Sequence, residues 1–197
     1  MKPASLPSLA LLGLVLCISL LSTPALAKPT SRVFLNGRPT PVFFNDGDSF
    51  AVLEGPLKGT KARLAGFNTL ESFGPVHKWG GWAPSELYVV AKEGALNARR
   101  GEWHCDSDLK RDGYGRILWI CQDLIEDDIR KGLAHAYSVD EKPADEKLLA
   151  LQRLAQAEKR GIWAKGVPPF LLTSTHSADE GGAGPEGTYN RLISTVD

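Results

Sequence analysis

The sequence predicts an α+β domain that follows an export signal. Short apolar runs bounded by glycine and proline come first, helical apolar spacing begins only after Pro84, and two more helical stretches complete the pattern. The chain has 197 residues, which suits one domain with a hydrophobic core. It carries 23 Lys and Arg against 23 Asp and Glu, so an all-basic surface that coats nucleic acid is excluded. Any such contact must come from a local groove.

Residues 1–27 have the layout of a cleavable secretory signal. A cation at Lys2 precedes an apolar run over residues 9–21, and small residues stand at Ala25 and Ala27. We expect cleavage after Ala27 and a secreted or periplasmic protein with no stable membrane association. An uncleaved membrane anchor is the alternative, although the apolar run is short for a spanning helix of about 20 residues. The polar residues 28–40 are predicted to be a flexible lead-in.

Three short strands are predicted over residues 41–44, 49–53 and 60–66, with turn residues between them. Alternation in the third strand places Arg63 and Ala65 on the same face. A loop over residues 72–83 follows. Its Trp79 and Trp82 would either line a groove or pack against the end of the domain.

Three helices and two strands are predicted in the second half of the chain. Pro84 can begin a helix that runs to about residue 101, because its missing N–H costs nothing in the first turn. Strands over residues 103–105 and 117–121 flank a charged turn. Further helices over residues 123–132 and 144–160 end at glycines. The Ser-, Thr- and Gly-rich residues 168–197 are predicted to be a disordered tail.

Two cysteines remain after signal removal, Cys105 and Cys121, and the export signal implies an oxidising compartment. We predict a disulfide between them; two buried, reduced cysteines on facing strands are the alternative. A zinc site is excluded because the histidines lack zinc-ligand spacing. No Gly-rich phosphate loop is present, which argues against nucleoside triphosphate chemistry. The four histidines are His77, His104, His135 and His176.

The residues with the strongest chemical signal are Arg63, Glu71 and Arg116, preceded by an acidic turn at residues 46–48. Phosphodiester hydrolysis needs a poised water and neutralisation of charge on the phosphoryl oxygens, which a carboxylate and two guanidinium groups can supply. Taken alone, each residue would more often be a surface ion pair or a solvated loop residue. Their order and spacing resemble the staphylococcal nuclease (thermonuclease) family from the acidic turn to about residue 165.

The resemblance implies a five-stranded OB-fold β-barrel with three helices, here over residues 41–167. It also implies a monomeric metal-dependent nuclease that cleaves DNA or RNA, in single-stranded regions, and leaves 3′-phosphate ends. Arg63 and Arg116 would clamp the phosphate, and Glu71 would orient or deprotonate the attacking water. Tyr114 and Tyr137 are candidates for stacking on the substrate, with core packing an equal alternative for Tyr137.

The resemblance further implies a Ca²⁺ ion held by Asp48, by residue 68 and by the backbone carbonyl of Thr69. Asn68 stands where the family has an aspartate, so the site should be weaker, because calcium affinity follows the charge of the ligands. The site could instead be retuned for another divalent cation. A third reading is a weakened or inactive barrel that binds nucleic acid in the cell envelope. Glu71 beside Arg63 and Arg116 favours the weak calcium enzyme, since a binding groove has no use for a positioned carboxylate. A protein-interaction scaffold built on Trp79 and Trp82 has less support.

Overall fold

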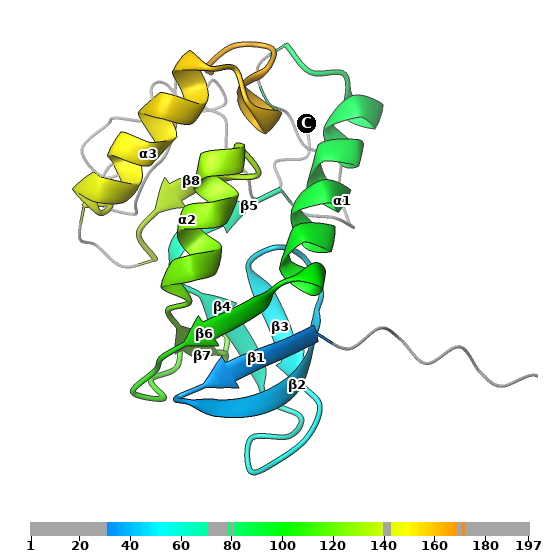
Figure 1. Cartoon of the computed structure of the whole chain (residues 1–197), viewed down its shortest axis with the longest axis vertical. Helices are drawn as coiled ribbons and strands as arrows, with labels where there is room; N and C mark the ends of the chain where they lie inside the picture. The colour runs from blue at the N-terminus through cyan, green and yellow to red at the C-terminus, as the bar shows by residue number, and fades with distance from the viewer. Residues whose placement is uncertain (1–30, 71–78, 80, 140–142, 169–170, 172–197) are drawn as a thin grey trace, which may run out of the picture.

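The computed structural model describes residues 31–70, 79, 81–139, 143–168 and 171. Within these residues the chain is an α+β domain with three α-helices and a curled mixed β-sheet that forms a half-barrel (Figure 1). The predicted signal over residues 1–27, Glu71 and most of the predicted tail lie outside the described residues. No helix among the described residues is long and apolar enough to cross a membrane.

Six strands form the curled sheet, in the order β6-β1-β2-β3-β4-β7. Neighbouring strands are antiparallel, except that β1 pairs with β6 and β4 with β7 in parallel. Side chains alternate between the two faces of a strand, so Phe44, Phe50 and Val52 point into the barrel and are buried. The strands are β1 (Ser31–Leu35), β2 (Arg38–Phe44), β3 (Ser49–Val52), β4 (Lys61–Leu64), β6 (Glu102–Cys105) and β7 (Ile117–Trp119).

β6 and β7 are the two edge strands of this sheet, and the residues that follow the end of each strand are joined to one another. Asp106 and Ile120 exchange two backbone hydrogen bonds of 2.9 Å, and Cys105 forms a disulfide with Cys121. The structure therefore contains the predicted disulfide. This junction, formed by residues 105–106 and 120–121, is the barrel seam.

The sequence predicts five strands, whereas the described residues contain eight. β1 and the start of β2 lie within residues 28–40, so most of the predicted lead-in belongs to the sheet. Asn36 and Gly37 have positive φ values of 47° and 76° and make a tight two-residue hairpin between β1 and β2. Val33 and Leu35 are buried in the core, which fixes β1 in place.

Two further strands form a separate antiparallel pair beside the barrel: β5 (Gly66–Thr69) and β8 (Ala134–Tyr137). The predicted third strand over residues 60–66 ends at Leu64 instead. Gly66 has a φ of 96°, a conformation that favours glycine, and it separates β5 from β4. The register of the pair places Asn68 opposite His135.

The first two helices follow their sequence signals closely, whereas the last one ends at Ala157, before the predicted residue 160. They are α1 (Pro84–Arg100), α2 (Gln122–Lys131) and α3 (Glu146–Ala157). Pro84 occupies the first turn of α1, and Gly132, with a φ of 69°, ends α2. The Asp145 side chain caps α3 by accepting hydrogen bonds from two backbone N–H groups. Figure 1 shows α1 and α2 above the barrel, with α3 beside α2 and β8.

A second apolar cluster packs between α1 and the 3-10 turn η1 (Gly161–Trp163). The indole N–H groups of Trp79 and Trp82 both donate to the Ile162 carbonyl, over 3.0 and 2.8 Å. Trp79 is fully buried in this cluster. These tryptophans therefore pack the end of the domain and do not line the pocket described below.

Candidate functional site

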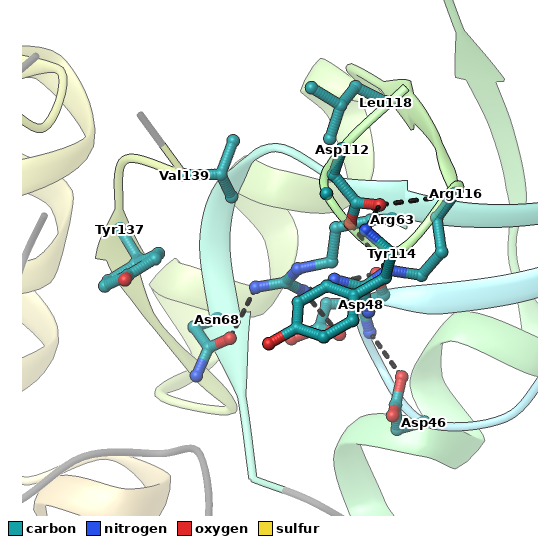
Figure 2. Close-up of a pocket in the computed structure, with 11 residues that line it drawn as sticks. Asp46, Asp48, Arg63, Asn68, Asp112, Tyr114, Arg116, Leu118, Tyr137 and Val139 are labelled. Carbon is teal, nitrogen blue, oxygen red and sulfur yellow. Dashed lines mark hydrogen bonds and ion pairs between the residues drawn. The ribbon is translucent and has the colours of Figure 1, made fainter. Parts of the chain in front are cut away.

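A pocket of about 740 Å³ opens where the turn before β3, the strands β4 and β5, and the β6–β7 connection meet. Figure 2 shows arginine and aspartate side chains converging on it from separate segments, with a tyrosine over its mouth. Its lining residues are Asp46, Asp48, Arg63, Asn68, Asp112, Gly113, Tyr114, Arg116, Leu118, Tyr137 and Val139. All predicted site residues within the described chain line it, except Thr69 and the two cysteines.

The acidic turn before β3 is held by its first aspartate. Asp46 Oδ1 accepts hydrogen bonds from the Ser49 hydroxyl at 2.7 Å and from the Asp48 N–H at 3.2 Å. A Cβ on Gly47 would lie 2.5 Å from the Thr69 methyl group, so only glycine allows β5 to approach so closely. The turn is thereby pressed against β5, which brings Asp48 beside Thr69.

Arg63 lies at the centre of the pocket wall, buried together with Asp48 and Asn68. Its Nη1 lies 2.5 Å from Asp48 Oδ1, and its Nη2 donates to Asn68 Oδ1, also at 2.5 Å. The other carboxylate oxygen of Asp48 accepts the Thr69 N–H at 2.8 Å. We name the group formed by Asp48, Arg63 and Asn68 the buried triad. The fork of the guanidinium links the acidic turn to β5, which a lysine could not do with the same geometry.

Arg116 reaches the pocket from the opposite side, at the end of a tight turn. Asp112 organises this turn, because its Oδ1 accepts the N–H groups of Tyr114 and Arg116 while its Oδ2 accepts from Arg116 Nε at 2.7 Å. Burial would raise the pKa of Asp112, but the hydrogen bonds from Arg116 and the turn backbone hold it below its usual value. Asp112 is therefore ionised and fixes the arginine in place.

The two predicted stacking residues differ in exposure. Tyr114 is 88% exposed, and the Arg116 guanidinium carbon lies 5.4 Å from its ring centre. Tyr137 is half-buried in β8, with its ring 5.9 Å from that of His135. Both line the pocket, so both rings border the space that a ligand would enter.

His135 is a residue of this region that the sequence does not point out. It lies opposite Asn68 in the β5–β8 pair and is buried, and burial lowers its pKa to about 3. Nδ1 of His135 and Nδ2 of Asn68 have no hydrogen-bond partner among the described residues. The neutral imidazole thus lies directly behind the buried triad. No sequence signal identifies it without knowledge of the β5–β8 register.

The residues expected to hold calcium lie together, but their contacts do not fit the ion. Calcium takes six to eight oxygen ligands. Here Asp48 is the one carboxylate of the expected set, and its two oxygens face Arg63 and the Thr69 N–H. The Asn68 carbonyl oxygen also faces Arg63. No group of three or more His, Cys, Asp or Glu side chains that could hold a metal occurs within the described ranges.

The half-barrel with a separate strand pair, together with a pocket bordered by two arginines and tyrosines, defines an OB-like domain of the nuclease type. A family model described as "Staphylococcal nuclease homologue" matches residues 61–165, more than half of the chain, and the chain belongs to this family. The resemblance inferred from the sequence motifs is thus confirmed. No curated protein matches the chain.

Family membership supports a nuclease-like hydrolase with nucleic acid as its substrate, in a family that is generally calcium-dependent. The matched residues include Arg63, Asn68, Glu71 and Arg116. The acidic turn with Asp48 lies before them, so its assignment rests on the motif and on its contact with Arg63.

Proposed function

We propose that this protein is a nuclease that hydrolyses phosphodiester bonds of DNA or RNA. The observation that carries the proposal is the convergence of Arg63 and Arg116 on one pocket from distant parts of the chain. Two guanidinium groups on opposite walls can hold a phosphate between them and neutralise the charge that grows on its oxygens. Surface ion pairs would not gather in this way around a common cavity.

The two arginines contribute differently. Arg116 contacts Asp112 through its Nε and its backbone N–H, and its two terminal nitrogens are the groups that would hold a phosphate. Arg63 is held deeper, by Asp48 and Asn68, and forms the charged floor of the site. Glu71 would orient or deprotonate the attacking water. The exposed Tyr114 ring offers a face for an unpaired base.

The finer properties of the enzyme are also part of the proposal. Attack at phosphorus would expel the 5′ oxygen and leave 3′-phosphate ends, as the family resemblance implies. The export signal at residues 1–27 would place the protein outside the cytoplasm, as a secreted or periplasmic enzyme. Calcium is the cofactor that the family implies, and the activity assay must therefore be run both with and without it.

Release of acid-soluble nucleotide from denatured DNA and from RNA tests this function. The purified protein should cleave in at least one of four conditions: chelator alone, calcium, magnesium or manganese. Glu71→Gln should lower the rate at least about 100-fold, the usual effect of removing a general base. Arg153→Ala is the control, because Arg153 is exposed on α3, away from the pocket. Absence of cleavage in all four conditions would refute the proposal.

A nucleic-acid-binding barrel without catalysis is the second candidate. It is favoured by Asn68, which puts a neutral amide where the expected calcium site has a carboxylate. A gel shift with denatured DNA that Glu71→Gln leaves unchanged, without cleavage in any cation, would establish this candidate in place of the enzyme.

A further inference from the structure

The buried triad already contains a cation. The guanidinium of Arg63 lies between Asp48 and Asn68, with 2.5 Å contacts to one oxygen of each. It also approaches two backbone carbonyl oxygens, of Asp48 and Phe67, at 3.4 Å. Four oxygens from the acidic turn and from β5 therefore surround one positive group. A bound metal ion would use oxygen ligands of the same kinds.

The charge of the triad is balanced without a metal. Asp48 contributes one negative charge, Arg63 one positive charge and Asn68 none, and all three residues are more than nine-tenths buried. Bringing a divalent cation next to a buried guanidinium is costly, because like charges repel strongly where water is excluded. An aspartate at position 68 would leave a net negative charge that a cation could neutralise. With asparagine at this position, the triad has no net negative charge for a cation to neutralise.

The orientation of the Asn68 amide works against a metal in the same way. Arg63 can only donate hydrogen bonds, so the amide must turn its oxygen toward Nη2. Its amino group then faces the other way and has no partner among the described residues. Rotating the oxygen toward an ion would set the amino group against the guanidinium. Without that rotation, the Asn68 oxygen keeps one lone pair for an ion, and that ion would lie against the guanidinium of Arg63.

We propose that Arg63 takes the place of the calcium ion in this protein, so that the pocket binds a phosphate group without a divalent cation. Asn68 is the residue that makes this exchange possible. The phosphate then meets only protein groups, the Arg63 and Arg116 guanidinium groups, which it shares with Asp48 and Asp112. The absence of a bound calcium ion is a property of the folded protein alone, and it is expected whether or not the protein cleaves nucleic acid.

Calorimetric titration with calcium, together with thermal unfolding in calcium and in chelator, tests the cation claim. The wild-type protein should show no saturable binding up to about 10 mM calcium, beyond the range of weak extracellular sites. Asn68→Asp should bind calcium at least about tenfold more tightly and gain thermal stability from it. Gln122→Glu is the matched control, since it makes the same charge change at an exposed position on α2. It should behave as the wild type does.

Titration with inorganic phosphate tests the second half of the proposal. The wild-type protein should bind phosphate equally in chelator and in calcium, whereas calcium should strengthen binding to Asn68→Asp. Saturable calcium binding by the wild type, or no gain of calcium binding in Asn68→Asp, would overturn the proposal. So would phosphate binding by the wild type that requires calcium. None of these measurements involves nucleic acid. Their outcome therefore does not depend on whether the protein cleaves DNA or RNA.

Discussion

Acid should destabilise this protein through His135, and replacing that residue should remove part of the effect. Its ring is buried between β5 and the tryptophan cluster, with the Trp79 ring centre at 6.0 Å and that of Tyr137 at 5.9 Å. Burial lowers the pKa of His135 from 6.5 to about 3. Between these values the unfolded chain binds a proton at this position and the folded protein does not. Stability is therefore lost as the pH falls below 6.5.

The size of the effect follows from the pKa difference. One pKa unit corresponds to about 1.4 kcal/mol of differential interaction. Near pH 4, roughly 2.5 units below the unfolded value, the folded state loses about 3 kcal/mol relative to neutral pH through this group alone. Domains of this kind are stable by about 5 to 15 kcal/mol, so the loss is a large part of the total.

Urea unfolding followed by tryptophan fluorescence, near pH 7.5 and near pH 4, measures the effect. His135→Leu has a similar volume and cannot be protonated, so it should lose about 3 kcal/mol less than the wild type between the two pH values. Because each protein is compared with itself at the two pH values, any packing cost of the substitution that does not depend on pH cancels. Arg153→Ala, at an exposed position on α3, should follow the wild type. Equal acid losses in His135→Leu and the wild type would refute the burial argument.

Three further predictions concern other parts of the chain. Arg116→Lys should lower the rate of DNA hydrolysis by about 100- to 1,000-fold with an unchanged melting temperature, because the forked phosphate contact is lost; a rate near that of the wild type would contradict it. Replacing Cys105 and Cys121 by serine together opens a 16-residue loop and should cost about 3 kcal/mol in denaturant unfolding; an unchanged midpoint would contradict it. Burial raises the pKa of Asp128 well above its usual value, so the wild type loses stability as the pH rises through that pKa. Asp128→Asn should therefore gain more in melting temperature at pH 8 than at pH 4, and an equal gain at both would contradict it.

Much of the fold could be predicted because its signals are local. Pro84 and Gly132 mark helix ends through their own backbone chemistry, which needs no partner elsewhere in the chain. The convergence of Arg63 and Arg116 followed from motif order, and the pocket brings both together. The hairpin at Asn36-Gly37 was also within reach, since an Asn-Gly pair between apolar residues is a strong turn signal.

The remaining features depend on register between distant segments. β5 and β8 are four residues each, and neither alternates clearly enough to be recognised alone. Only their pairing places His135 behind Asn68. Likewise, the sequence shows that Asn68 is not an acid but cannot show that Arg63 contacts its amide oxygen. Such contacts arise from tertiary packing, which local propensity does not encode.

The barrel seam also bears on how the protein must be produced. Without the covalent link between Cys105 and Cys121, the barrel seam is held by the two backbone hydrogen bonds between Asp106 and Ile120 and by few contacts beside them. Unjoined strand edges are templates for pairing with other chains. Synthesis in a reducing cytoplasm would therefore favour intermolecular association and insoluble material, whereas passage through an oxidising compartment would seal the sheet before neighbouring copies meet it.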